Sequence, residues 1–231
     1  MTLFVEGLLL FFVLVANRLT FIYILNRRLH MSFVKNPALT FLYFIGTALA
    51  VAGLFWAYAV ELFTTHSVVS VFACLAVVTV LNPWVYDQLE KRERRPTRFA
   101  RAHPDQQFLL IEDKYLLSKT GDVIFQQLVA GILLLIMARS GIPLETLVPV
   151  FAGIFLLSHV HLFFITKAIW ALYFSIFATL WAFVFPFLIL YVEGGVYYAI
   201  AIHTFWYVGS GAFFGFLEQA TETATRTRRK S

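Results

Sequence analysis

The chain has 231 residues, of which 60% are hydrophobic and 13% are charged, and its mean hydropathy is +0.79. Soluble domains carry about 25% charged and about 45–50% apolar residues, so this composition excludes a soluble globular protein and predicts an integral membrane protein. The formal net charge of +5 does not indicate a nucleic-acid partner, because the basic residues fall between apolar segments, where they contact the lipid bilayer. The single cysteine, Cys74, lies within an apolar segment, which excludes a disulfide framework.

Seven segments are long and apolar enough to cross a bilayer, which requires about 20 residues each. All are predicted to be helices, because lipid offers no hydrogen-bond partners to an open backbone. The first segment has neither the basic flank nor the cleavage site of a signal peptide, so we expect it to be retained. The predicted spans of this all-α, polytopic helix bundle are 3–25, 39–62, 67–86, 120–138, 147–166, 168–191 and 195–217.

The positions of lysine and arginine predict how the spans are oriented. Of the 18 basic residues, 16 lie in the first, third and fifth connections and in the C-terminal tail. Cytoplasmic connections are enriched in lysine and arginine. We therefore expect the N-terminus outside and the C-terminus in the cytoplasm. Termini on opposite sides require an odd number of spans, and seven satisfies this.

The longest connection, residues 87–119, begins with the basic stretch DQLEKRERRPTRFARAH and continues with DQQFLLIEDKYLLSK. We expect the second stretch to form an interfacial amphipathic helix that leads into the fourth span. The sequence contains no internal repeat and no soluble second domain. We therefore expect one membrane domain, with three spans in 1–86, this connection, a core in 120–217 and a basic tail in 218–231.

Polar residues are rare inside the predicted spans, and each is costly unless it has a partner or a function. Asp122 follows Gly121 at the expected start of the fourth span, where a carboxylate caps free backbone N–H groups. Gln126 and Gln127 are expected to form hydrogen bonds between helices. Arg18 is expected either to extend to the cytoplasmic interface or to pair inside the bundle.

Two histidines, His159 and His203, lie well inside separate spans. One buried histidine is usually a packing residue, but two on separate helices, with Asp122 on a third, suggest a shared polar site. At about 1.5 Å per residue, His203 falls near the midplane and Asp122 on the order of 10 Å toward the cytoplasm, so a shared site requires tilted helices. His161 is two residues from His159 and is expected to face another side of its helix.

Residues 115–215 resemble the CPBP family of intramembrane metalloproteases, which includes CAAX prenyl proteases and bacteriocin-processing proteins. That family carries the motifs EExxxR, FxxxH and HxxxN on successive membrane helices. The counterparts in this sequence are GDVIFQQ at 121–127, FLLSH at 155–159 and HTFWY at 203–207.

The three motifs are retained to different degrees. The second is complete, and in the third Tyr207 stands where asparagine is expected. In the first, Gly121 and Asp122 stand in place of the two glutamates and Gln126 in place of the arginine, while Phe125 is retained. Because the family uses a glutamate as general base toward a water molecule, the resemblance implies impaired or lost peptidase activity.

The resemblance assigns catalytic roles to Asp122, His159 and His203, and the two histidines would be the ligands of a zinc ion where a metal is used. The supporting residues would be Gln126, Phe155, His161 and Tyr207. Two functions stay open: a hydrolase with Asp122 as its base, or a pseudoenzyme that holds a membrane protein or a hydrophobic peptide in the same cavity. The family also implies a prokaryotic plasma membrane. A retinal protein is disfavoured, because the last span contains no lysine for a Schiff base.

Overall fold

The computed structural model describes residues 3–64, 67–92, 94–110 and 112–228, and within these residues it contains helices and no strand. Seven helical stretches of this part of the chain are long and apolar enough to cross a membrane, as the sequence predicted. In chain order the helices are α1 (Leu3–Leu19), the π-helix η1 (Thr20–Asn26), α2 (Pro37–Leu54), α3 (Trp56–Phe63), α4 (Val68–Ala76), the π-helix η2 (Val77–Leu81), α5 (Asn82–Lys91), α6 (Thr97–Ala102), the 3-10 helix η3 (Gln107–Leu110), α7 (Asp113–Arg139), α8 (Leu144–His159), α9 (Leu162–Ile165), α10 (Ala168–Tyr191) and α11 (Gly195–Arg228).

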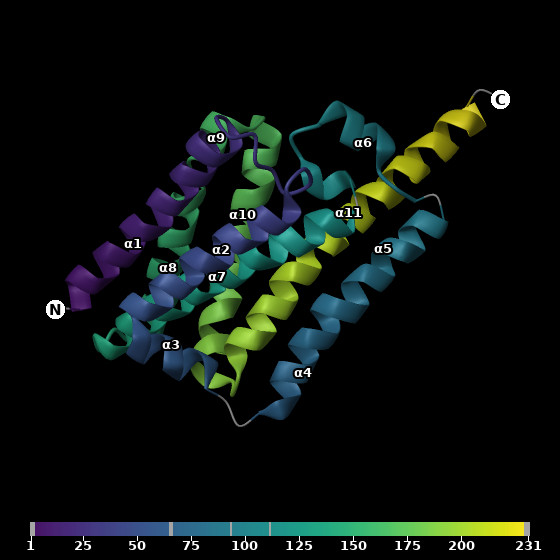
Figure 1. The fold of residues 1–231 in the computed structure, drawn as a ribbon. Helices are drawn as coiled ribbons and strands as arrows, with labels where there is room; N and C mark the ends of the chain where they lie inside the picture. Colours follow the sequence, from purple (N-terminus) through teal and green to yellow (C-terminus); the bar gives the residue numbers. More distant parts are fainter. Residues whose placement is uncertain (1–2, 65–66, 93, 111, 229–231) are drawn as a thin grey trace.

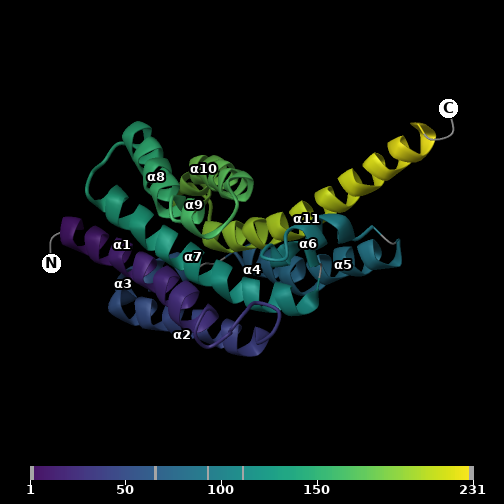
Figure 2. The same ribbon diagram turned by 90° about the horizontal axis from the view of Figure 1, so that it is seen from above.

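Helix α7 runs through the middle of the bundle (Figure 1). Seen from above, α1, α2 and α3 lie on one side of it, and α8, α9 and α10 lie on the other (Figure 2). In its apolar stretch 78% of the residues are buried, whereas the share is 17% for the stretch formed by α1 and η1. The peripheral helices therefore expose apolar side chains to lipid, and α7 forms the core on which they pack.

The contact between α2 and α7 depends on the missing side chain of Gly121. A Cβ atom at this position would lie 2.9 Å from Cδ2 of Phe41 and 3.1 Å from the carbonyl oxygen of the same residue. Small residues at a membrane-helix interface let two backbones approach closely. Gly121 consequently brings α2 directly onto α7, and position 121 faces α2.

The helix predicted to lead into the fourth span is not separate from it. Helix α7 begins at Asp113 and continues without a break to Arg139, so residues 113–119 are the first turns of the span itself. Its two buried polar residues have partners within the protein: the Ser118 hydroxyl donates to the carbonyl oxygen of Phe33 at 2.6 Å, and Lys119 forms an ion pair. One side of this stretch therefore packs inside the bundle.

Other predicted boundaries also change in the structure. The second span, predicted as 39–62, is divided, because Phe55 has φ −117° and ψ 40° and ends α2 before α3 begins. The sixth span, 168–191, is confirmed as α10. Helix α11 continues well beyond the predicted residue 217, to Arg228.

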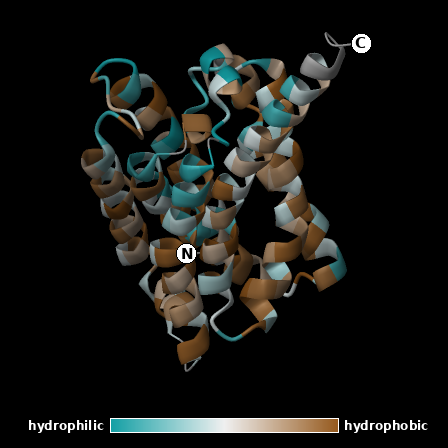
Figure 3. Cartoon of the chain, turned by 90° about the vertical axis from the view of Figure 1, so that its right-hand side faces the viewer, coloured by the Kyte–Doolittle hydropathy of each residue, from teal (hydrophilic) through white to brown (hydrophobic). Residues whose placement is uncertain are grey.

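The long end of α11 holds the segment around α6 in place. The Glu218 carboxylate, which is 5% exposed, accepts hydrogen bonds from the backbone N–H of Arg98 at 2.8 Å and from the Thr97 hydroxyl at 3.0 Å. It thus caps the N-terminus of α6 from another helix. Hydrophilic stretches gather at this end of the bundle (Figure 3), which agrees with an aqueous interface there.

We expect Gly121→Ala to lower the free energy of unfolding by about 1–3 kcal/mol, because the added methyl group overpacks the contact with α2. The matched control is Gly46→Ala in α2, where nothing lies within 4 Å of the added Cβ and helix propensity favours alanine by up to about 1 kcal/mol. Unfolding of both variants in detergent measures the difference. Equal stabilities would contradict the close approach of α2 to α7.

Candidate functional site

Asp122 is fully buried and holds two cations. Its Oδ1 lies 2.9 Å from a guanidinium nitrogen of Arg18 on α1, and its Oδ2 lies 2.5 Å from Nζ of Lys119, one turn earlier on α7. Both carboxylate oxygens are therefore engaged. The interpretation of Asp122 as a helix cap is wrong, because it is an internal residue of α7. Arg18 takes the second of its two expected positions and pairs inside the bundle.

We call Arg18, Lys119 and Asp122 the charge cluster; with all three groups ionised its net charge is +1. Aromatic rings surround its two cations. Lys119 Nζ lies 4.3 Å from the centre of the Tyr207 ring, and the Arg18 guanidinium lies 5.9 Å from that of Phe44. Cations are attracted to the face of an aromatic ring, and the attraction is stronger where water is excluded. These rings therefore help to keep the cations within the bundle.

Gln127 connects α7 to α11, as predicted for an intramembrane glutamine. Its Nε2 lies 2.8 Å from Nδ1 of His203, and the Tyr207 ring stacks on the imidazole with centroids 5.6 Å apart. The same prediction does not hold for Gln126. Its Nε2 is enclosed and has no hydrogen-bond partner of normal geometry among the described residues.

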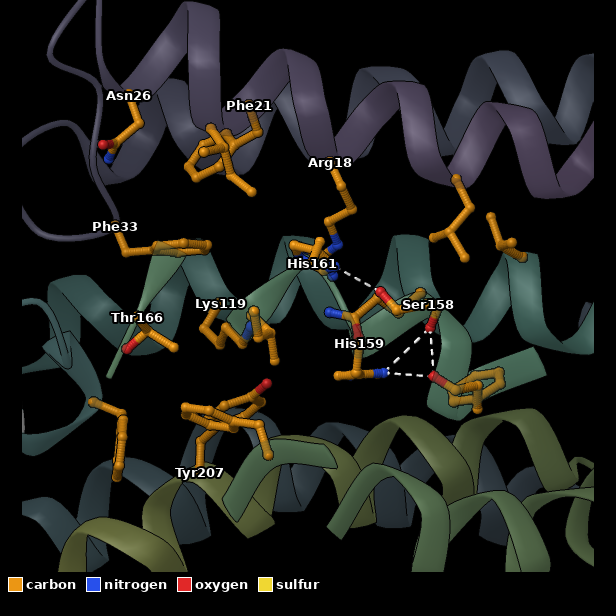
Figure 4. Close-up of a pocket in the computed structure, with 18 of the residues that line it drawn as sticks. Arg18, Phe21, Asn26, Phe33, Lys119, Ser158, His159, His161, Thr166 and Tyr207 are labelled. Carbon is orange, nitrogen blue, oxygen red and sulfur yellow. Dashed lines mark hydrogen bonds between the residues drawn. The ribbon is translucent and has the colours of Figure 1, made fainter. Parts of the chain in front are cut away.

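His159 is the last residue of α8, and its Nδ1 lies 2.8 Å from the carbonyl oxygen of Phe155. The Nδ1 of His161 lies 2.6 Å from the carbonyl oxygen of Ser158 (Figure 4). A carbonyl oxygen can only accept, so both Nδ1 atoms donate, and each neutral ring keeps Nε2 as an acceptor. His161 was expected to face another side of its helix than His159, but α8 ends at His159, and both side chains line the same cavity.

This cavity lies between α1, α7 and α8 and has a volume of about 430 Å³, within the usual range of about 300–1,000 Å³ for ligand pockets. Figure 4 shows Arg18 entering it from α1, Lys119 from α7 and Tyr207 from α11. Its polar lining residues include Arg18, Asn26, Arg27, Asp105, Gln106, Lys119, Gln126, Ser158, His159, His161 and Thr166, and its apolar ones include Leu10, Phe11, Leu14, Val129, Ala130, Leu133, Ile154 and Phe155.

The structure brings the three predicted catalytic residues together only in part. His203 on α11 contacts Gln127, which lies on α7 little more than one turn beyond Asp122. Only His159 of the three lines the cavity. In the part of the chain that the structure describes, no three His, Cys, Asp or Glu side chains form a group that could hold a metal ion. With both oxygens of Asp122 engaged by cations, the site does not fit zinc.

The position that the resemblance assigns to the first glutamate also points away from the cavity. Gly121 faces the backbone of Phe41, and a side chain at this position would collide with α2. Gly121 is not among the lining residues. The packing of α2 on α7 thus leaves no room for a base at this point of the helix.

The sequence reasoning missed Lys119, which it treated as a topology signal in a cytoplasmic connection. The three-residue spacing of Lys119 and Asp122 was the available signal, because residues three apart face each other on a helix. It also missed the end of the cavity where a connection meets α9. There the Gln106 amide donates to the Thr166 hydroxyl at 2.8 Å, and that hydroxyl donates to Asp105 at 3.0 Å.

Comparisons of the chain with protein-family models, with curated proteins and with solved structures give no match. The resemblance to the CPBP family therefore stays a prediction from three short motifs.

We expect Asp122→Ala to lower the free energy of unfolding by about 3–5 kcal/mol, because it leaves two enclosed cations without their counterion. The matched control is Asp87→Ala, which removes the exposed partner of Lys91 and should cost at most about 1 kcal/mol. Unfolding in detergent measures both. If Asp122→Ala were no more costly than the control, the charge cluster would not be a structural requirement.

Proposed function

We propose that this protein is a non-catalytic intramembrane binding protein that holds an apolar, membrane-borne molecule in the cavity between α1, α7 and α8. The observation that carries the proposal is the state of Asp122, the one acid left at the first motif. Its oxygens lie against Arg18 and Lys119. A general base must reach the proton that it removes, and this buried carboxylate instead forms ion pairs with two cations.

The lining of the cavity supports binding of a molecule that is largely apolar. Ligand pockets are mostly hydrophobic and carry a few polar groups that fix orientation. Leu14 on α1, Leu133 on α7 and Ile154 on α8 contribute such apolar walls, whereas Lys119 and His161 contribute polar ones. A molecule with a long apolar part and a smaller polar part matches this arrangement of apolar and polar lining residues.

In terms of the CPBP resemblance, the chain is a pseudoenzyme that keeps the cavity and lacks the base. The proposal includes a prokaryotic plasma membrane, with the N-terminus outside and the basic connections in the cytoplasm. The polar end of the cavity, at Arg27 and Asp105, then lies on the cytoplasmic side.

A second candidate function, peptide hydrolysis, is favoured by one observation: His159 and His161 line the cavity and each neutral ring keeps an acceptor nitrogen there. The test uses the purified protein, with and without added zinc, and fluorogenic membrane-tethered peptides. We expect no cleavage above that of Asp122→Asn. Cleavage by the unmodified chain that His159→Ala abolishes would replace the binding proposal with a hydrolase.

We expect Leu14→Trp to abolish retention of the bound molecule, because the indole fills the apolar part of the cavity. The control is Leu8→Trp on the same helix, at a side chain that is 43% exposed, and it should leave retention unchanged. His159→Ala should also retain the molecule, since no cleavage step is involved. Mass spectrometry of the molecules that copurify with each variant measures retention. Equal retention by Leu14→Trp and Leu8→Trp would exclude this cavity as the binding site.

A further inference from the structure

The wall of the cavity carries an unbalanced positive charge. Arg18 and Lys119 both line it, with side chains that are 22% and 11% exposed, while Asp122, the anion between them, is completely buried and does not line it. Among the described lining residues one is an acid, Asp105. It accepts hydrogen bonds from Thr166 and Gln106 and forms no ion pair with Arg18 or Lys119 among the described residues. One positive charge near α1 and α7 is therefore left without a counterion inside the protein.

An uncompensated charge is costly within a membrane domain, where little water is present to solvate it. An anion in the cavity would remove this cost. Gln126 also lines the cavity, and its amide interacts with the Asp122 carboxylate. The two cations Arg18 and Lys119 together form a recognition site for an anionic group.

The apolar walls continue from this polar group along α7. From Lys119 to Leu133, both of which line the cavity, the helix rises about 20 Å. Leu10 and Leu14 of α1 line the same length of the cavity from the opposite side. The π-helix η1, which follows Arg18, also contributes lining residues, and π-helical turns are frequent at functional sites.

We propose that the cavity binds a single-chain amphiphile whose anionic head group, a carboxylate or a phosphate monoester, lies against Arg18 and Lys119 and whose apolar chain extends toward Leu133. This inference rests on the proposed binding function and names the class of its ligand. Charge complementarity selects the head group, and the apolar part of the cavity, whose total volume is about 430 Å³, accepts the chain.

The first test compares head groups on the unmodified protein. Tritiated oleate is first bound to the protein in a neutral detergent. The competitors that are compared are unlabelled oleate, oleoyl lysophosphatidate, oleyl alcohol, oleylamine, acetate and inorganic phosphate. We expect oleate and the lysophosphatidate to displace the probe at concentrations about tenfold or more below that of oleyl alcohol, because hydrogen bonds to charged groups are the stronger ones. The stronger of these two competitors shows whether the site prefers a carboxylate or a phosphate.

Two outcomes of this comparison overturn the inference. Equal displacement by oleyl alcohol and oleate would mean that the cavity binds the apolar chain and does not distinguish a charged head group from a neutral one. Displacement by acetate or inorganic phosphate as strong as that by the matching amphiphile would mean that the site binds a free anion and that the chain contributes nothing.

The second test changes the net charge of the cluster. Arg18→Gln lowers it from +1 to 0 and should weaken oleate binding about tenfold or more, with binding of oleyl alcohol unchanged. The double variant Arg18→Gln with Asp122→Asn restores +1 through Lys119 and should recover oleate binding. A purely structural role of Arg18 predicts no such recovery. The control, Arg139→Gln, removes an exposed ion pair with Glu61 and should bind oleate normally.

The two proposals fail in different ways. If Leu14→Trp binds both oleate and oleyl alcohol as well as Leu8→Trp does, the proposed binding function is wrong. If Leu14→Trp blocks both probes and the head groups do not differ, the cavity binds chains and only the anionic specificity is wrong. Should Arg18→Gln fail to fold, the head-group comparison on the unmodified protein decides.

Discussion

A carboxylate enclosed between two cations determines how this bundle is assembled. Asp122 needs a partner, because an isolated charge is poorly tolerated in a low-dielectric interior, and it takes Arg18 from α1 and Lys119 from its own helix. Pairing with Arg18 fixes α1 against α7, while Gly121, on another face of the same turn, brings α2 against it. Gln127, little more than one turn later, reaches His203 on α11. Within three turns α7 thus positions three neighbouring helices.

The same arrangement decides between chemistry and binding. Both carboxylate oxygens of Asp122 lie against cations, and for this reason we propose binding in place of the hydrolysis that the sequence motifs suggest. The net positive charge of the cluster faces the cavity through Arg18 and Lys119. A positively charged wall attracts an anion, and together with the apolar surfaces of α1 and α8 it is the basis for the proposed amphiphilic ligand.

The two histidines illustrate why a motif and a site differ. FLLSH places His159 at the end of α8, and the structure uses its Nδ1 to bind the Phe155 carbonyl within the same motif. His203 is bound by Gln127, a residue outside the catalytic pattern. The spacing of the second motif is preserved, but the partner of each imidazole is set by packing: His159 contacts a backbone carbonyl of its own helix, and His203 contacts an amide from α7.

The sequence by itself determined the membrane environment, the helical class and the seven spans, since each of these follows from apolar stretches of about 20 residues. It also identified Gln127 as an interhelical contact, because an intramembrane amide needs a partner. Only the tertiary structure decided that Asp122 pairs with Arg18, that α7 extends back to Asp113, and that position 121 faces α2. Hydropathy is a property of neighbouring residues, whereas these contacts join residues far apart in the chain and depend on how whole helices pack.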